Sequence, residues 1–347
     1  RGRLNMLGPN CMGLYVPSAR VSLWEGVSPQ PGPVAFLAQS GGHCLQFSHY
    51  ALGFGIRFSK VISFGNACLL GATDFLEYLK EDPETKIVAL YLEGMKDGPR
   101  LVRLVREMNP TKPVIIWKAG LTEAGARAAS SHTGSLAGTR QIWDTFFRQT
   151  GAVPATGLDE LADIIMTFLY LKPLPGGRVA LVSSGGGHSV ASTDVCAREG
   201  LEVPALSPET QRQLRDFIPL AGTSISNPLD VERIQRDTSL LERVLGLVAA
   251  DPLIDLVLIN LQLDILHRAH PEQLQGLAST LTSFVKSQDK AVVAVLDSWG
   301  EEPAVRSARS RLRAELPRAG IPIYRSLPRA ARALGRFVRY HQSLKAS

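Results

Sequence analysis

Short apolar runs alternate with longer amphipathic stretches along most of the chain. The runs lie at residues 34–38, 58–64, 87–91, 113–117, 179–183, 256–260 and 291–295. Each run is rich in β-branched or aromatic residues, and each is followed by a Gly, Pro or polar turn and then by a helical pattern. This alternation predicts an α/β fold with mainly parallel sheets.

One short segment interrupts the alternation. The sequence LKPLPGGR, residues 171–178, contains two prolines and two glycines and is typical of a linker. A chain of 347 residues is also long for one core, because domains average roughly 150 residues. We therefore expect two domains, one over residues 31–171 and one over residues 172–347.

The two halves resemble each other at the start of each series of strands. VAFLAQSGGH, residues 34–43, and VALVSSGGGH, residues 179–188, both contain an apolar strand, a polar pair, glycines and a histidine. This repetition predicts one flavodoxin-like, doubly wound module used twice in tandem. Two unrelated Rossmann-like units remain the alternative.

The repeated loop has the chemistry of an anion site. Glycines after a strand leave the backbone N–H groups open, and the following helix directs its positive dipole end to the same point. The candidate phosphate-binding residues are Ser40, Gly41 and Gly42 in the first half and Gly185, Gly186 and Gly187 in the second. One such turn is a weak signal, because it also occurs where a helix simply packs on a strand, but two copies strengthen it.

Composition indicates an ordinary globular protein, with 45% hydrophobic and 20% charged residues. No apolar run approaches the ~20 residues that span a bilayer, so we expect no membrane segment. The four cysteines show no C-x-x-C spacing, so we expect neither a metal site nor a disulfide framework. This use of cysteine favours a reducing, cytoplasmic setting. The chain begins without methionine, and we expect its first residue to be a cut end.

Basic residues are concentrated at the end of the chain. Residues 306–347 contain eleven Lys or Arg and one acidic residue, Glu315. Because the arginines alternate with Ala, Leu and Pro, we interpret them as the solvated face of a final helix, with a phosphate-bearing partner as a further possibility. No aromatic platform or nucleic-acid motif accompanies the charge, so no nucleic-acid partner is expected.

A histidine lies in a segment of small residues, AASSHTGSLAG, residues 128–138. The preceding residues 118–130 are small and polar, and we expect them to form a loop over the carboxyl edge of the first sheet. The same edge should carry Glu93, directly after the run IVALYL at residues 87–92. A carboxylate on one ring nitrogen of His132 would leave the other nitrogen as a nucleophile. A surface histidine in a flexible loop is the simpler alternative.

Several motifs together resemble the nucleoside-diphosphate-forming acyl-CoA synthetases, the family of succinyl-CoA synthetase and ADP-forming acetyl-CoA synthetase. They are GPNCMGL at 8–14, QSGGH at 39–43, YLEG at 91–94, SSHTGSLAG at 130–138 and ISNPLDV at 225–231. The resemblance covers nearly the whole chain. It implies that residues 1–30 are the end of a CoA-binding Rossmann domain plus a linker, with most of that domain missing.

The resemblance also implies an activity, that of an acid–CoA ligase. Acyl-CoA, NDP and phosphate would be interconverted with acid, CoA and NTP through acyl phosphate and phosphohistidine intermediates. His132 would carry the phosphoryl group and Glu93 would orient its ring, while the two glycine loops would hold the phosphate between them. Asn10, Cys11, Gly65 and Asn66 would lie near the CoA thiol and the acyl group.

The implied substrates are CoA and ATP or ADP, with Mg²⁺ bound alongside the nucleotide on a domain that this chain lacks. The implied partners are an ATP-grasp domain or subunit and the missing CoA-binding domain, in a homo- or hetero-oligomer. The chain alone is expected to be incomplete as an enzyme. A paired α/β module that binds a small molecule or CoA ester, and a regulatory relative without turnover, are the alternatives.

Two features depart from or qualify the pattern. Related chains carry polar and acidic residues after FGN, whereas ACLLG, residues 67–71, follows here. We therefore expect a more apolar acyl pocket and a larger acid than acetate. His43 and His188 lie just inside predicted helix starts and are interpreted as capping-turn or packing residues.

Overall fold

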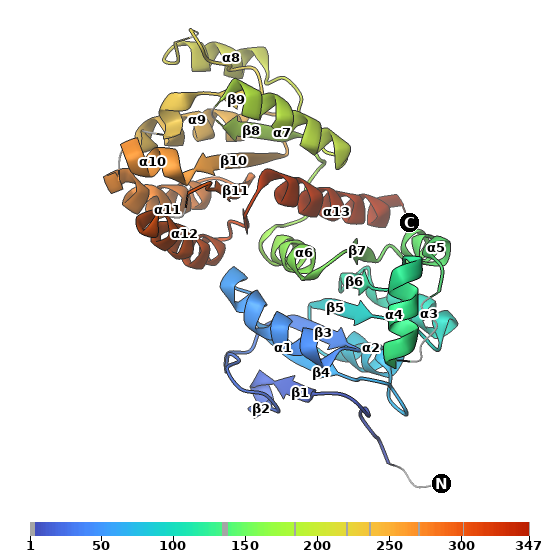
Figure 1. The fold of residues 1–347 in the computed structure, drawn as a ribbon. Helices are drawn as coiled ribbons and strands as arrows, with labels where there is room; N and C mark the ends of the chain where they lie inside the picture. Colours follow the sequence, from blue (N-terminus) through green and yellow to red (C-terminus); the bar gives the residue numbers. More distant parts are fainter. Residues whose placement is uncertain are drawn as a thin grey trace. The chain divides into compact units, whose positions relative to one another are not determined.

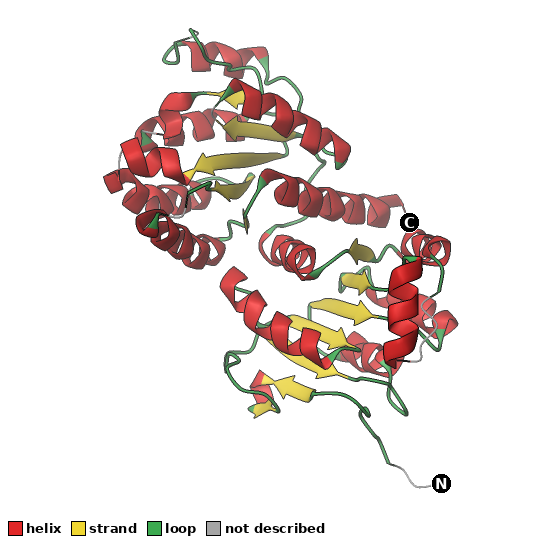
Figure 2. Cartoon of the chain, in the orientation of Figure 1, coloured by secondary structure: helices red, strands yellow, loops and turns green. Residues whose placement is uncertain are grey.

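The computed structural model describes residues 4–133, 138–183, 185–219, 221–235, 237–269, 271–300 and 302–346, without the side chains of 130–133, 235, 269, 271–275 and 346. The chain divides into two compact units (Figures 1 and 2). The first unit comprises Arg1–Phe168 with Ser343–Ser347, and the second comprises Leu169–Gln342.

The first unit is built on a seven-stranded sheet, counted over the described residues, in the order β2-β1-β4-β3-β5-β6-β7. Its strands are β1 Gly13–Val16, β2 Val21–Ser22, β3 Val34–Ala38, β4 Phe58–Ser63, β5 Ile87–Leu92, β6 Val114–Lys118 and β7 Val153–Ala155. Strand β1 is antiparallel to β2 and β4, whereas neighbours from β4 through β7 are parallel.

Helices cover both faces of this sheet (Figure 1). They are α1 Gly41–Tyr50, α2 Ala72–Glu81, α3 Gly98–Met108, α4 Glu123–Thr133, α5 Arg140–Thr150 and α6 Leu158–Tyr170, with short 3-10 helices at Pro17–Ala19 and Ala51–Phe54. On one face, leucines of α2 and α3 and aromatic residues of α5 pack on alternate residues of β3, β5 and β6. On the other face Phe47 of α1 packs on Phe36, with ring centroids 4.7 Å apart. Both faces of the parallel strands are therefore buried, as their continuous apolar runs require.

The second unit contains a parallel sheet of five strands among its described residues, in the order β12-β11-β10-β8-β9. The strands are β8 Val179–Ser183, β9 Leu229–Asp230, β10 Leu256–Gln262, β11 Ala291–Asp297 and β12 Ile323–Tyr324. The helices are α7 Gly186–Arg198, α8 Pro208–Arg215, α9 Thr238–Ala250, α10 Leu263–Ala269, α11 Pro271–Lys286, α12 Pro303–Glu315 and α13 Leu327–Ala346, with short 3-10 helices at Glu232–Gln235 and Leu316–Ala319. In the described part of the chain no helix is long and apolar enough to cross a bilayer.

The parallel strands of the two units have the same order. Numbered from the first parallel strand of each unit, both sheets run 2-1-3-4-5, which is the flavodoxin-like order. The registers also correspond: Val34 pairs with Ile87 in one sheet, and Val179 pairs with Leu256 in the other. The prediction of two tandem flavodoxin-like modules is confirmed.

One local prediction is wrong. Residues 118–130 were expected to form a loop, but Glu123–Thr133 form helix α4. The segment lacks large side chains, yet it is rich in Ala, which has the highest helix propensity, and it carries Glu123 in the first turn, where a carboxylate favours the helix dipole. The main-chain N–H of Gly125 also donates to the Thr122 hydroxyl at 3.1 Å, which caps the helix start. Small residues here therefore indicate a lightly packed helix.

The division into units differs in detail from the linker-based boundary. The first unit ends at Phe168, inside α6, and takes up Ser343–Ser347 from the end of α13. A Cβ atom on Gly151 would lie 3.6 Å from the Ser343 hydroxyl, so the end of α13 packs beside the turn after α5. Residues 343–347 were predicted to belong to the second domain.

Candidate functional site

The carboxyl ends of β3 and β5 meet at the point where the strand order of the first sheet reverses, and Gln39 links them. The side-chain oxygen of Gln39 accepts hydrogen bonds from the N–H groups of Glu93 and Gly94, the latter at 2.9 Å. Open α/β sheets place their ligands at this switch point. The structure thus brings the first glycine loop and Glu93 to one sheet edge, as the sequence predicted, through a glutamine that sequence reasoning missed.

The glycine loop of the first unit begins helix α1. Ser40 is the N-cap, and its hydroxyl oxygen accepts the N–H of His43 at 3.3 Å. Gly41 and Gly42 form the first turn, whose N–H groups have no partner one turn earlier in the helix. A Cβ on Gly41 would lie 2.6 Å from Cγ of Met12, so glycine permits the β1 segment to pack closely here. This end of α1 can accept an anion from the Gly42 side.

The Glu93 carboxyl lies in a buried setting, with the residue only 6% exposed. The Tyr91 hydroxyl donates to Glu93 Oε1 at 3.1 Å. The Tyr91 ring packs edge-on against His43, with centroids 4.4 Å apart, and against Trp117 at 4.7 Å. Burial lowers the pKa of His43, although the Glu93 carboxylate opposes this. His43 is thus both a capping-turn and a packing residue, as expected, and Tyr91 is a missed neighbour of Glu93.

Lys118 ends strand β6 directly beside the Glu93 turn. It is 5% exposed, and its ammonium donates to the main-chain oxygen of Glu93 at 2.8 Å and to that of Ala119. The ammonium also lies 5.3 Å from the ring centroid of Trp143. Burial lowers the pKa of Lys118 to about 8 against the opposing attraction of Glu93. The site edge therefore combines a buried carboxyl and a buried amine.

The predicted phosphoryl carrier follows the same edge along the chain. After β6 the chain turns through Gly120, at φ +77°, into α4, and the backbone of His132 lies in the last turn of that helix. The side chain of His132 lies outside the described residues. Its role stays a prediction.

The residues expected near the CoA thiol come together in the structure. The main-chain N–H of Asn66 donates to Pro9 O at 3.0 Å, and the side chain of Asn10 lies 3.4 Å from Asn66 Oδ1. A Cβ on Gly65, which has φ +55°, would lie 2.3 Å from Pro9 O. Cys11 continues the same segment and is half-buried. The first segment of the chain is therefore fixed along the end of β4.

A cavity of about 780 Å³ lies between Asn66 and Gly94, the residue after Glu93. Gln39 and Gly94 line one side, and residues 66–69 and 71 line another. Leu69 is 57% exposed, and the Lys96 ammonium donates to Ala67 O at 2.9 Å. The cavity thus offers apolar surface at Leu69 next to the Lys96 ammonium, and Asp74, Asp97 and Arg100 also line it.

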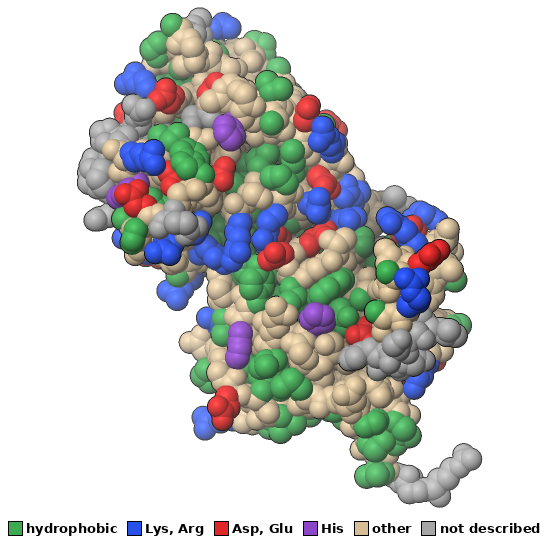
Figure 3. Space-filling view, viewed as in Figure 1, with side chains coloured by type: hydrophobic (Ala, Val, Ile, Leu, Met, Phe, Trp, Pro, Cys, Tyr) green, Lys and Arg blue, Asp and Glu red, His purple; other side chains and the backbone are tan. Residues whose placement is uncertain are grey.

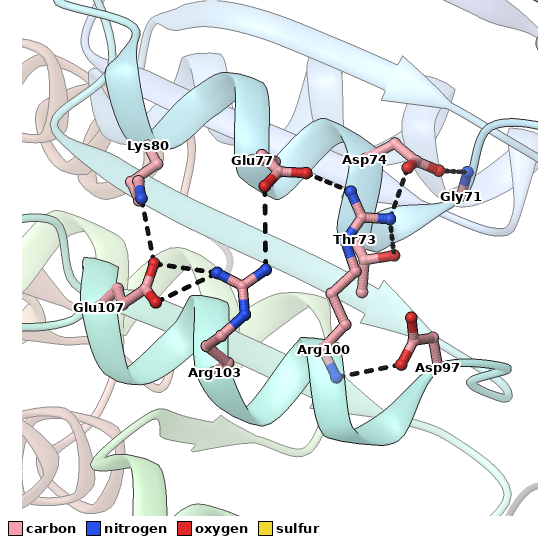
Figure 4. A network of polar contacts seen from close by, with 9 residues as sticks. All are labelled: Gly71, Thr73, Asp74, Glu77, Lys80, Asp97, Arg100, Arg103 and Glu107. Atoms are coloured by element: carbon pink, nitrogen blue, oxygen red, sulfur yellow. Dashed lines mark hydrogen bonds and ion pairs between the residues drawn. The ribbon is translucent and has the colours of Figure 1, made fainter.

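One wall of this cavity is held by ion pairs between α2 and α3 (Figure 4). Arg100 contacts Asp74, at 2.7 Å, and Glu77. Asp74 in turn accepts the N–H of Gly71 at 2.8 Å, which closes the start of α2. Opposite charges neutralise one another across this wall, and the turn at Gly71 is fixed.

The glycine loop of the second unit is built differently. Gly185 is the N-cap of α7 with φ +93°, and its N–H donates to Asp230 Oδ1 at 2.6 Å. Gly186 and Gly187 follow in the exposed first turn. By strand register, the position of Asp230 in the first unit is occupied by Ser63. The second loop therefore already holds a carboxylate, and the two predicted phosphate loops are not equivalent.

The basic residues near the end of the chain are exposed or half-buried. On the face in Figure 3, basic side chains gather over the part of the second unit that carries α12 and α13. The apolar residues of α12, such as Val305 and Leu312, are buried, and Arg332 of α13 pairs with Glu199 at 3.1 Å. This agrees with a solvated basic face. The described residues contain no cluster of His, Cys, Asp and Glu that could hold a metal ion.

Comparison with known proteins gives the family. Residues 31–168 match the model of the succinyl-CoA ligase like flavodoxin domain. The chain is 36% identical over 256 residues, 74% of its length, to two enzymes: ADP-forming acetate–CoA ligase I of Archaeoglobus fulgidus, and the alpha subunit of ADP-forming acetate–CoA ligase II of Pyrococcus furiosus. These matches cover 37% and 55% of the two relatives, so the chain spans only part of their length.

A solved structure is similar over nearly the whole chain. The dinucleotide-forming acetyl-coenzyme A synthetase 1 of Ca. Korarchaeum cryptofilum, in complex with phosphate and ADP, superposes with a TM-score of 0.83 at 27% identity. The match covers 98% of this chain and 71% of that one. The similarity therefore includes the second unit, which the domain model does not reach. From its motifs, its sheet order and these relatives, the chain belongs to the NDP-forming acyl-CoA synthetase family.

Proposed function

We propose that this chain is the part of an acid–CoA ligase in which a phosphoryl group passes between an acyl phosphate and His132. The complete reaction interconverts acyl-CoA, NDP and phosphate with acid, CoA and NTP. Glu93 orients the imidazole and stabilises the cation that forms as phosphate is gained or lost. The first turn of α1, at Ser40, Gly41 and Gly42, receives the phosphate.

The observation that supports this proposal most is the shared edge of the first sheet. The start of α1 and the buried Glu93 follow β3 and β5, between which the sheet order reverses, and β6, which leads into the His132 helix, is the next strand along the same edge. A helix N-terminus stabilises a phosphate, and a carboxylate stabilises an imidazolium. The phosphate and the imidazolium occur together when a phosphoryl group is transferred to or from a histidine. The adjacent cavity and the Asn10, Cys11, Gly65 and Asn66 segment supply room for the acid and the CoA thiol.

The proposal requires parts beyond this chain. CoA and ATP or ADP are the substrates, with Mg²⁺ bound with the nucleotide on an ATP-grasp domain or subunit. A CoA-binding domain precedes the segment at Asn10. In the assembled enzyme Gly185, Gly186 and Gly187 act as the second phosphate loop. The reaction belongs to the cytoplasm, where acyl-CoA pools are used.

Phosphorylation of His132 tests the function directly. The chain is incubated with an ATP-grasp partner of this family and ATP labelled at the γ-phosphate. We expect a label that is labile in acid and stable in base, because a phosphoramidate on imidazole hydrolyses in acid whereas a serine ester does not. His132→Asn should abolish the label, and His43→Ala and His188→Ala should keep it. Label that survives in His132→Asn, or that is acid-stable on Ser130 or Ser131, would favour a binding module instead.

A further inference from the structure

Two lysines flank strand β6, the half-buried Lys112 and the buried Lys118, and only the first has a counterpart in the second unit. Lys112, just before the strand, donates to the main-chain oxygens of Leu79 and Asp82, each at 2.7 Å. Lys118, at the other end, donates to those of Glu93 and Ala119. Both ammonium groups therefore hold the carbonyls of neighbouring turns.

The second unit repeats the first lysine. By strand register, Val114 corresponds to Val292, because each pairs with the second residue of the neighbouring strand, Val88 or Val257. Lys112 then corresponds to Lys290, which donates to Asp251 O and Ile254 O, each at 2.7 Å. A lysine at this end of the strand therefore makes the same kind of main-chain contact in both units.

The second unit does not repeat the other lysine. Lys118 pairs with Leu92, and Leu296 pairs with Leu261, which is the equivalent position of the neighbouring strand. Lys118 therefore corresponds to Leu296. Glu93 corresponds in turn to Gln262, one residue beyond Leu261. The buried carboxyl and amine of the first unit are therefore replaced together by an amide and an apolar side chain. The fold does not need either charge at these positions.

Burying an ammonium group costs free energy, so a buried ammonium is expected where its charge and its hydrogen bonds have a structural or functional role. Because Leu296 fills the corresponding position in the second unit, packing alone does not explain Lys118. We propose that Lys118 is a positioning residue for phosphoryl transfer at His132, acting through Glu93; this inference rests on the proposed function.

The hydrogen bonds of Lys118 indicate how it positions Glu93 and the start of α4. It clamps the Glu93 carbonyl, while Gln39 holds the Glu93 and Gly94 N–H groups from the other side. Through Ala119 the same ammonium fixes the turn that leads into α4 and His132. The positive charge also lies at the sheet edge that receives the phosphate dianion. Lys118 therefore ties the orienting carboxylate to the helix of the phosphoryl carrier.

The groups around Lys118 predict a pH dependence. Among the described residues, the charged group that acts on its pKa is the Glu93 carboxylate of the β5 turn. From α5, Trp143 covers the ammonium with an uncharged ring. With a pKa of about 8, the cation is lost as pH rises through that value. The rate of His132 labelling should fall above about pH 8 for this reason.

The test compares Lys118→Leu, the residue that the second unit carries, with Lys118→Arg and Lys112→Met. Using the chain with its ATP-grasp partner and labelled ATP, we expect Lys118→Leu to slow labelling about 10- to 100-fold, the effect of losing charge-assisted hydrogen bonds. Lys118→Arg should restore most of the rate and abolish the decline above pH 8, because arginine stays charged. Lys112→Met should be labelled at a rate within about three-fold of wild type, because Lys112 lies at the end of β6 opposite to Lys118 and Glu93. Wild-type labelling rates in Lys118→Leu, or an unchanged alkaline decline in Lys118→Arg, would overturn the inference.

A second measurement separates this inference from the proposed function. Hydrogen exchange of the Glu93, Gly94 and Ala119 amides needs no catalysis, and it should be faster in Lys118→Leu and near wild type in Lys118→Arg. If wild type is never labelled, the proposed function fails, and faster exchange in Lys118→Leu still supports the clamp. Unchanged exchange at all three amides in Lys118→Leu refutes the positioning role whatever the activity.

Discussion

Asp230 Oδ1 accepts the main-chain N–H of Gly185 at 2.6 Å, at the start of helix α7. A carboxylate at a helix N-terminus is favourable by itself, because it meets the positive end of the helix dipole. It also occupies a donor that a phosphate would use. In the first unit the corresponding position is Ser63, which is neutral, so the first loop should bind an anion more readily than the second.

Asp230→Asn should therefore increase phosphate binding at the second loop. Removing the negative charge relieves a repulsion of about 1 kcal/mol, or roughly five-fold in affinity, while asparagine can still accept the Gly185 hydrogen bond. A titration with inorganic phosphate, followed by the NMR shifts of the Gly185, Gly186 and Gly187 amides, measures this. Weaker phosphate binding in the variant would mean that Asp230 assists the anion rather than competing with it.

Glu93→Gln should slow His132 labelling strongly. A neutral amide stabilises an imidazolium less than a carboxylate, and one lost charge-assisted hydrogen bond costs about 1.5–3 kcal/mol, or roughly 10- to 150-fold in rate. The rate of label incorporation, compared with the thermal unfolding midpoint of each variant, separates this from loss of fold. Labelling at the wild-type rate would remove Glu93 from the mechanism.

Tyr91→Phe should have a smaller effect through the same carboxylate. The hydroxyl donates to Glu93 Oε1 at 3.1 Å, and a hydrogen bond to a charged group contributes about 1.5–3 kcal/mol, of which only the part that orients Glu93 affects the labelling rate. We expect labelling to slow about two- to ten-fold. Tyr340→Phe, which changes a buried tyrosine of the second unit, is the matched control and should label normally. Equal effects of the two substitutions would indicate a general loss of stability.

The stability of the protein should depend on pH through Lys118. Its folded-state pKa is lowered by burial to about 8, whereas a lysine in an unfolded chain titrates near 10.4. Between these values the unfolded state binds more protons, so the free energy of unfolding rises with pH in this window, by on the order of 2–3 kcal/mol. Urea unfolding at pH 7.5 and 9.5 should show this rise in wild type and a smaller rise in Lys118→Leu. The exposed substitution Lys172→Met should keep the wild-type rise, and an equal rise in all three would contradict the assignment.

Asn227→Ala should destabilise the second unit. Asn227 has φ +96°, and its side chain donates to Val179 O at 2.9 Å and Pro204 O at 2.7 Å and accepts the N–H of Leu181 at 2.9 Å. Losing these bonds beside β8 should cost about 2–4 kcal/mol. Chemical unfolding checks the value, with the adjacent Ser226→Ala as control. A cost below about 1 kcal/mol would mean that these side-chain hydrogen bonds do not stabilise the second unit.

The acyl selectivity should follow the cavity beside Leu69. With residues 66–69 and 71 on its wall, the complete enzyme is expected to prefer a branched or aryl acid to acetate. The ratio of kcat/KM for such an acid to that for acetate, measured on the assembled enzyme, tests this expectation. Equal or faster turnover of acetate would show that these residues do not set the selectivity.

The sequence by itself determined the architecture and the family. Continuous apolar runs such as 34–38 and 87–91 can only be buried between two layers of helices, and the repeat at residues 34–43 and 179–188 predicts that one module occurs twice. Both conclusions depend on local pattern, which a single chain displays directly. The motifs around Glu93 and His132 identified the family for the same reason, because each lies in a few consecutive residues.

Tertiary structure decided which residues surround those motifs. Gln39 follows β3 and Lys118 ends β6, and the sheet register brings both to the Glu93 turn at the end of β5. The motifs contain Gln39 and Tyr91 but do not show that these side chains contact the Glu93 turn, since a polar residue near the end of a strand is common. The inequality of the two glycine loops arises in the same way, because Asp230 reaches Gly185 from 45 residues along the chain. Long-range pairing, which the sequence does not display, fixed the electrostatics of both loops.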